Sequence, residues 1–176
     1  MARAPLRAPL IVAPFVYGPP LTTVMSRFKY EGRLEYLPVL SLLLAELQGD
    51  IPERPSCVCP LPLHWQRRLR RGFNQSELLA RGLASTMGLP MATHWLRKHR
   101  RTRPQVGLDE HMRQSNVNGA FTARRHCAGS HVLLVDDVMT TGATLLEARA
   151  ALLDAGAKQV DCVVLAATTP DGNQTM

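Results

Sequence analysis

The chain has 176 residues, 45% of them hydrophobic and 20% charged, a composition typical of a globular protein that argues against disordered and fibrous classes. No apolar run approaches the roughly 20 residues of a membrane-spanning helix. The short, proline-broken N-terminus does not fit a signal peptide, so we expect a cytoplasmic protein. The net charge of +7 favours an anionic partner, either nucleic acid or a phosphorylated small molecule.

The N-terminal segment, residues 1–52, is expected to form a helical hood. Residues 10–17 are compatible with a strand. Apolar residues then recur at helical spacing from Leu21 to Phe28, and a second apolar helix is expected from Tyr36 to Leu47. A proline-rich connection follows, so we predict that the main domain begins at residue 53.

The main domain, residues 53–170, opens with a short buried strand at Cys57–Leu63 and a loop that begins at His64. Asn74 lies three residues before Glu77, a spacing typical of a capping box at the start of a helix. Between that strand and that helix lies a basic cluster, which we expect to form a loop at the edge of the sheet. The cluster consists of Arg67, Arg68, Arg70 and Arg71.

The segment 97–119 combines many cations with little apolar periodicity, which predicts a flexible lid. Residues 93–96 and 120–122 at its two ends are expected to pair as a two-stranded arm. Arg103 and Gln105 are its candidates for ligand contact. A solvated basic loop is the alternative interpretation.

The strongest local pattern begins at an unbroken apolar run, Val132–Val135, of the kind buried on both faces of a parallel sheet. The run stops at two carboxylates, Asp136 and Asp137, where we expect the strand to end. The small-residue turn Thr140–Thr144 then opens a helix, and the next strand is expected at Gln159–Ala167. Together these elements predict a βαβ unit with a right-handed crossover.

The turn Thr140–Thr144 predicts an anion site, because small residues let successive backbone N–H groups face one concavity and the helix adds its positive end. Two carboxylates one turn away fit the vicinal hydroxyls of a ribose, or a Mg²⁺ held through water. These features describe a sugar that bears a 5′-phosphate. Acids at a strand end by chance are the alternative. The Rossmann and P-loop fingerprints do not fit, because they lack a preceding acidic pair.

The run Val132–Thr144 resembles the phosphoribosyl pyrophosphate (PRPP) signature of type I phosphoribosyltransferases. More narrowly, Pro60–His64 with Arg71–Gln75, and Phe28–Tyr30 nearer the start, resemble the ComF family, also called GntX-like. The order strand, basic loop, helix matches the position of the pyrophosphate-binding loop in that fold. The resemblance extends over about residues 17–167.

The resemblance implies an α/β protein with the type I phosphoribosyltransferase fold, a mainly parallel sheet flanked by helices. Its strands are expected near Cys57, His131 and Gln159, with a further one near Phe121. The N-terminal hood and the flexible lid are features of the same fold. In that fold the lid closes over PRPP and excludes water from a reactive, oxocarbenium-like carbon.

The resemblance also implies a role for each candidate residue. Catalytic roles fall to Asp136, Asp137 and Arg71. The ribose and the 5′-phosphate are expected to bind Asp136, Asp137, Thr140, Thr141, Gly142, Ala143 and Thr144. Pyrophosphate and lid contacts are expected from His64, Arg67, Arg71, Arg103 and Gln105. The cofactor Mg²⁺ is expected at Asp136 and Asp137, directly or through water.

The implied reaction is transfer of the phosphoribosyl group of PRPP to a nitrogen nucleophile, with release of pyrophosphate. The acceptor, a nucleobase or an amine, is not identified by the sequence. Relatives that use hypoxanthine or guanine carry an Asp at the position of Thr140, and a hydroxyl is no general base near neutral pH without a strong partner.

An alternative from a different class is a non-catalytic module that senses PRPP or binds nucleic acid. The ComF family's association with competence and DNA uptake supports it, with single-stranded DNA or DNA-uptake proteins as partners. A homodimer is a further candidate assembly.

One departure from the family is the lack of a cysteine-rich zinc ribbon, since no cysteine precedes Cys57. Either the chain starts late or it represents a ribbon-free branch, and no zinc is expected. The cysteines are interpreted as buried, reduced thiols; they are Cys57, Cys59, Cys127 and Cys162.

Three other polar residues receive structural interpretations. His131 is expected at the surface, Lys29 in solvent and Tyr30 in a packed position, with ligand contact as the alternative for Lys29 and Tyr30. Residues 171–176 are expected to form a tail.

Overall fold

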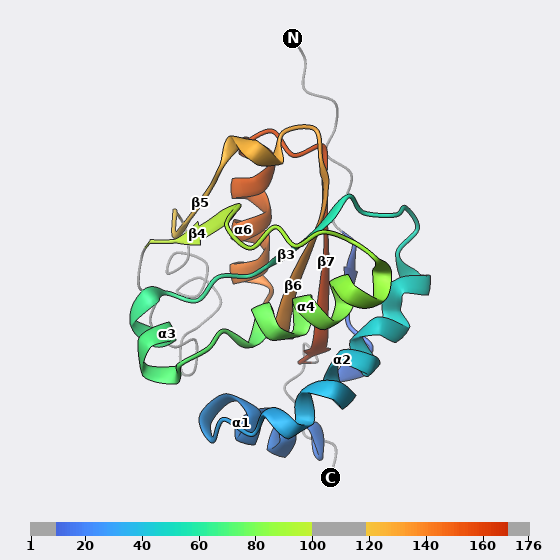
Figure 1. Cartoon of the computed structure of the whole chain (residues 1–176), viewed down its shortest axis with the longest axis vertical. Helices are drawn as coiled ribbons and strands as arrows, with labels where there is room; N and C mark the ends of the chain where they lie inside the picture. The colour runs from blue at the N-terminus through green and yellow to red at the C-terminus, as the bar shows by residue number, and fades with distance from the viewer. Residues whose placement is uncertain (1–9, 100–118, 169–176) are drawn as a thin grey trace.

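The computed structural model describes residues 10–99 and 119–168, and its centre is a parallel sheet (Figure 1). Within these residues the sheet has five strands in the order β1-β7-β6-β3, with β2 also paired to β7. The strands are β1 (Ile11–Val12), β2 (Phe15–Val16), β3 (Cys57–Pro60), β6 (His131–Met139) and β7 (Gln159–Ala167). Every pairing among them is parallel. The predicted α/β class is therefore confirmed.

Helices flank this sheet, and a small antiparallel pair, β4 with β5, lies apart from it. The helices are α1 (Leu21–Tyr30), α2 (Leu37–Ala45), α3 (Trp65–Arg71), α4 (Gln75–Met87) and α6 (Ala143–Asp154). Three 3₁₀ turns are η1 (Leu34–Tyr36), η2 (Glu46–Asp50) and η3 (Arg125–Cys127). The antiparallel pair consists of β4 (Leu96–Lys98) and β5 (Phe121–Ala123).

The core has two halves, one on each face of the sheet. Leu133 and Val135 of β6 pack on the face covered by α1, α2 and α4. Val132 and Leu134 pack on the opposite face, against α6 and the β4–β5 pair. Because successive side chains of a strand point to opposite faces, covering both faces explains why β6 begins as a continuous apolar run.

The predicted two-stranded arm forms, from β4 and β5, but the prediction that the strand near Phe121 joins the main sheet was wrong. The strand near Phe121 pairs only with β4 among the described residues and is not part of the main sheet. The outer edge of β7 is instead occupied by Ile11 and Val12, opposite Cys162 and Val163. The N-terminal segment therefore contributes strands as well as a helical hood. A domain division at residue 52 stays a prediction.

The prediction that the central strand ends at the carboxylates was also wrong. β6 continues to Met139, because Val138 and Met139 remain paired with Ala166 and Ala167 of β7. On its other side, β6 loses its partner when β3 ends at Pro60. The two carboxylates thus lie on a strand that is paired on one side only.

The predicted basic loop after His64 is a helix, α3. The His64 ring accepts a hydrogen bond from the backbone N–H of Gln66 at 3.4 Å, and Gly72 closes the helix in the left-handed conformation at φ +81°. Arginine is a good helix former, so a cluster of arginines between two such end signals forms about two turns of helix.

The helix that follows, α4, starts after Asn74 as predicted, but without the capping box. The Asn74 amide donates to the backbone oxygen of Leu61 at 3.0 Å, and the carboxylate of Glu77 contacts Arg81 at 2.9 Å. Asn74 therefore ties the start of α4 to the end of β3.

The four cysteines are buried and free, which confirms their interpretation as reduced thiols. Burial raises the pKa of Cys59 and of Cys162 to about 12. The surface interpretation of His131 was wrong, because its Nε2 lies 2.8 Å from Asp161 Oδ2 at a buried position. No helix in the described part of the chain is long and apolar enough to cross a membrane.

The hood is held on the core by close contact between α2 and α4 at Gly82. A Cβ atom added to Gly82 would lie 2.6 Å from Ser41 Cβ. We therefore expect Gly82→Ala to lower the free energy of unfolding by about 1–3 kcal/mol through overpacking, although alanine is the better helix former. Chemical denaturation measures this change.

Two further variants separate overpacking from a general helix effect. Ser85→Ala, at an exposed position of the same helix, should change stability by less than about 0.5 kcal/mol. Adding Ser41→Gly to Gly82→Ala should recover part of the loss, because it removes the clashing atoms. A Gly82→Ala protein as stable as the parent would contradict this account of the hood contact.

Candidate functional site

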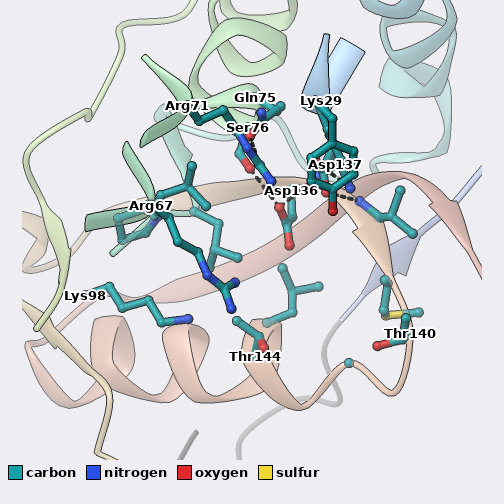
Figure 2. A pocket seen from close by; sticks show the side chains of 18 of the residues that line it. Lys29, Arg67, Arg71, Gln75, Ser76, Lys98, Asp136, Asp137, Thr140 and Thr144 are labelled. Atoms are coloured by element: carbon teal, nitrogen blue, oxygen red, sulfur yellow. Dashed lines mark hydrogen bonds and ion pairs between the residues drawn. The ribbon is translucent and has the colours of Figure 1, made fainter. Parts of the chain in front are cut away.

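A cavity of about 650 Å³ opens where β3 and β6 end (Figure 2). Its walls come from α1, α3, α4, β4, β6 and the start of α6. In open α/β sheets, ligands bind outside the carboxyl ends of the strands. The polar lining residues include Lys29, Arg67, Arg70, Arg71, Gln75, Ser76, Lys98, Asp136, Asp137, Thr140 and Thr144.

The floor of this cavity carries the two carboxylates of β6. Asp136 Oδ1 accepts hydrogen bonds from Ser76 Oγ at 2.7 Å and from the backbone N–H of Asp137 at 2.8 Å. Asp137 Oδ1 accepts from the backbone N–H of Val138 at 2.6 Å, and its Oδ2 lies 2.9 Å from Lys29 Nζ. Groups from α4 and α1 thus meet the acidic pair from two sides.

The surroundings of the acidic pair shift the pKa of Asp136 and of Lys29. Burial, followed by the charge of Asp137, raises the pKa of Asp136 to about 7, and the hydrogen bond from Ser76 offsets only part of that shift. Burial alone would lower the pKa of Lys29, but the charge of Asp137 and the hydrogen bond to it raise the pKa overall. Lys29 is therefore a charged counter-ion and not the solvated lysine predicted.

A basic wall faces the carboxylates. Figure 2 shows Arg67 of α3 and Lys98 of β4 extending toward Thr144. Lys98 Nζ lies 5.1 Å from the centre of the Phe121 ring. Burial and then the charge of Arg67 lower the pKa of Lys98 to about 8. Cations brought this close together suit a ligand with more than one negative charge.

Arg71, also on α3, is fixed by two contacts. Its Nη1 donates to Gln75 Oε1 at 2.7 Å, and its guanidinium lies 5.1 Å from the centre of the Tyr30 ring. Tyr30 itself is 70% exposed, so its interpretation as a packed residue was wrong. Gln75 is buried, and its Nε2 has no hydrogen-bond partner among the described residues, which leaves a donor beside the cavity.

The turn before α6 forms the remaining wall. Gly142 adopts the left-handed conformation at φ +76°, and a Cβ there would approach Met139 Sδ to 3.3 Å. The positive φ is the reason that this turn favours glycine. Thr140, Gly142 and Thr144 line the cavity, next to the N-terminus of α6, where the helix dipole favours an anion.

The structure brings most of the predicted site residues together and leaves some out. The cavity is lined by Asp136, Asp137, Thr140, Gly142, Thr144, Arg67 and Arg71. It is not lined by His64, Thr141 or Ala143. Arg103, Gln105 and nearly all of the predicted lid lie outside the described residues.

Sequence reasoning missed Ser76, Gln75 and Lys98, and it misjudged Lys29. Gln75 is the last residue of the Arg71–Gln75 motif and Ser76 follows it directly, so the motif was the available signal for both residues. Lys98 lies in the basic segment that was predicted to be a lid. No local pattern linked Lys29 to Asp137, because they are far apart in the sequence and meet only through the packing of α1.

The two carboxylates fit a Mg²⁺ ion that takes most of its ligands from water and from substrate phosphates. Within residues 10–99 and 119–168 no three His, Cys, Asp or Glu side chains are grouped as a metal site. Asp136 Oδ2 makes no hydrogen bond to a described residue. Mg²⁺ commonly binds one or two carboxylates and fills its octahedron with water and substrate phosphates, which is compatible with this donor set.

Comparison with known proteins identifies relatives over most of the chain. The model of the phosphoribosyl transferase domain matches residues 70–175. DNA utilization protein YhgH of Salmonella typhi is 36% identical over 159 residues, covering 86% of this chain and 69% of that protein. Competence protein F of Haemophilus influenzae is 30% identical over 152 residues, covering 82% and 66%. A purine phosphoribosyltransferase structure from Pyrococcus horikoshii aligns with a TM-score of 0.45 and 21% identity, covering 80% and 78%.

The raised pKa of Asp136 predicts a stability cost that grows with pH. With a folded-state pKa of about 7 against an ordinary 3.8, the folded protein holds a proton that the unfolded chain releases, so stability falls as pH rises toward 7. We expect Asp136→Asn, which stays neutral, to raise the free energy of unfolding by about 1–3 kcal/mol at pH 8.

The increase in the free energy of unfolding of Asp136→Asn should become smaller as the pH falls toward 4. Chemical denaturation in metal-free buffer at several pH values measures it. Asp50→Asn, at an exposed position outside the cavity, is the control and should show no such pH-dependent gain. A loss of stability at pH 8 in Asp136→Asn would mean that the acidic pair is not under electrostatic stress.

Proposed function

The chain belongs to the phosphoribosyl transferase family, with DNA utilization and competence proteins among its relatives, and on this premise we propose that it binds PRPP with Mg²⁺. We further propose that it transfers the phosphoribosyl group to a nitrogen nucleophile and releases pyrophosphate. The observation that carries the proposal is the meeting, in one cavity, of an anion-binding turn, an acidic pair and a basic wall.

Each of the three parts of PRPP is complementary in charge and hydrogen bonding to a different group of residues that line the cavity. The 5′-phosphate suits the turn with Thr140, Gly142 and Thr144, where small residues and a helix N-terminus favour an anion. The ribose hydroxyls are donors that Asp136 and Asp137 can accept. The pyrophosphate group, with several negative charges, suits the basic wall of Arg67, Arg71 and Lys98. This division supports PRPP over a simple monophosphate.

The proposed chemistry is mainly electrostatic. The C1′–O bond to pyrophosphate breaks with its electron pair, and the acceptor nitrogen forms the C1′–N bond. Arg67, Arg71 and Lys98 would stabilise the charge that grows on the departing group. Mg²⁺ bound near the acidic pair would add Lewis-acid stabilisation of the pyrophosphate. Asp136 and Asp137 would orient the ribose so that C1′ faces the acceptor.

A second candidate function is a non-catalytic module that senses PRPP or handles nucleic acid. The outer face of α3 favours it, because Trp65 is 59% exposed beside the exposed Arg68. Exposed aromatic rings next to cations suit stacked bases and phosphates of single-stranded DNA.

Pyrophosphate release separates the two functions. The chain is incubated with PRPP, Mg²⁺ and a panel of bases and amines. A transferase should release pyrophosphate with at least one acceptor, and a sensor should release none.

The first prediction of the proposed function concerns PRPP affinity. We expect the double variant Asp136→Asn, Asp137→Asn to bind PRPP with Mg²⁺ roughly a hundredfold or more weakly, because charge-assisted hydrogen bonds to the ribose are worth about 1.5–3 kcal/mol each. Isothermal titration calorimetry measures the loss. Asp50→Asn should bind as the parent does, and a double variant with parental affinity would remove the acidic pair from the PRPP site.

The second prediction concerns the acceptor that is excluded. Thr140 replaces the Asp that handles a ring proton in relatives of the hypoxanthine-guanine type, and a hydroxyl is a poor base near neutral pH. We expect no appreciable turnover of hypoxanthine or guanine, and none after Thr140→Asp alone, because the rest of the acceptor pocket stays unshaped for a 6-oxopurine. Chromatography of reaction mixtures detects the nucleotide products. Their formation at about 1 s⁻¹ or faster would contradict this interpretation of Thr140.

A further inference from the structure

A second, smaller cavity of about 200 Å³ adjoins the first on the hood side. The two cavities share Lys29, Tyr30, Arg70 and Arg71, and the second adds Gly32 and Phe73. Because four lining residues are common to both, a ligand in the smaller cavity would lie next to a ligand in the larger one. The smaller cavity is built where the end of α1 meets the end of α3.

The chemistry of this second cavity is cationic and aromatic. Three of its six lining residues are Lys29, Arg70 and Arg71, and none is acidic. Lys29 uses one contact for Asp137, and an ammonium group has three donors. The Arg70 side chain makes no hydrogen bond or ion pair to another described residue. The smaller cavity is therefore lined by three cations and by no carboxylate.

Two aromatic side chains, Tyr30 and Phe73, lie beside these cations. The Tyr30 ring is mostly exposed, and one side of it is approached by the Arg71 guanidinium at 5.1 Å from the ring centre. Phe73 lines the same cavity and packs on Phe28 with ring centres 5.8 Å apart. A flat ring with an attached anion matches these surfaces, since it can stack on an aromatic side chain while its charge meets a cation.

The position of this cavity suits the acceptor in the proposed reaction. The turn before α6, the acidic pair and the basic wall account for the three parts of PRPP. Among the lining residues that remain, Lys29, Tyr30 and Arg70 also line the smaller cavity, between α1 and α3. The acceptor nitrogen must reach C1′ from a side that the pyrophosphate does not occupy, and this is a remaining polar side.

Building on the proposed function, we propose that the second cavity binds the acceptor, and that the acceptor is a planar nitrogen compound with a carboxylate or a similarly small anionic group. The anion lies between Lys29 and Arg70, and the ring lies against Tyr30. The nitrogen lone pair forms the C1′–N bond while the C1′–O electron pair leaves on pyrophosphate. An N–H acceptor then gives its proton to solvent, and a pyridine-type nitrogen has none to lose.

The test compares ligand pairs that differ in charge but not in ring. Nicotinate with nicotinamide, and orotate with uracil, are titrated by calorimetry into the full chain with Mg²⁺ and PRPP, and again without PRPP. We expect at least one carboxylate to bind about tenfold more tightly than its neutral partner, as a charge-assisted contact implies. Arg70→Gln should remove that difference, and the PRPP affinity of the variant is measured separately in the absence of any acceptor.

Arg68→Gln is the matched control. It lies on the same helix two residues away, lines neither cavity and pairs at 3.4 Å with Glu77, which keeps its contact with Arg81 when Arg68 is lost. This variant should preserve the preference for carboxylates. Circular dichroism of both variants checks that α3 still folds.

The outcomes separate this inference from the proposed function. Equal binding of carboxylates and neutral partners, or a carboxylate preference that survives Arg70→Gln, overturns the inference even when PRPP binds and pyrophosphate is released. A carboxylate preference that Arg70→Gln removes supports the anion site even when PRPP fails to bind. Binding at Arg70 by a single-stranded oligonucleotide and by none of the small carboxylates overturns it in favour of a nucleic-acid contact.

Discussion

The cavity is arranged around two adjacent carboxylates, at the place where β6 continues beyond the end of its neighbour β3. Close like charges in a partly buried site repel each other, and burial makes the ionised state costlier. Three elements supply the compensation: Ser76 from α4, Lys29 from α1 and the backbone of β6 itself. The acidic pair therefore joins the hood to the core as well as forming the floor of the cavity.

The two faces of the sheet contribute different chemistry to the same edge. α6, on one face, begins at the small-residue turn that suits a phosphate. On the opposite face, α1 and α4 carry the groups that balance or fix the carboxylates. The α2–α4 contact at Gly82 and Ser41 lies on the same side of the sheet. Met25 and Phe28 of α1 are buried in that half of the core, and the same helix carries Lys29 to Asp137.

Sequence patterns predicted the features that are encoded locally. The strand, acidic pair, small-residue turn and helix from Val132 to Asp154 were recovered because each signal lies beside the next. What failed needed long-range information: three residues at Phe121 do not indicate which sheet they join, and nothing near Lys29 indicates Asp137. Clustered arginines are compatible with either a loop or a helix, and α3 is distinguished from a loop only by the combination of end signals at His64 and Gly72.

The same contrast explains why the sequence points to PRPP but not to the acceptor. A phosphate can be bound by backbone N–H groups, whose geometry is set by a few consecutive small residues, so the proposed phosphate site is visible as a short motif. An acceptor is distinguished by side chains that converge from separate elements; in the proposed acceptor site these are Lys29 and Tyr30 of α1 with Arg70 of α3. Substitutions in those elements can alter that site without changing the motif from Asp136 to Thr144. Under the proposed function, the motif corresponds to the phosphoribosyl donor, and the junction between the hood and α3 corresponds to the acceptor.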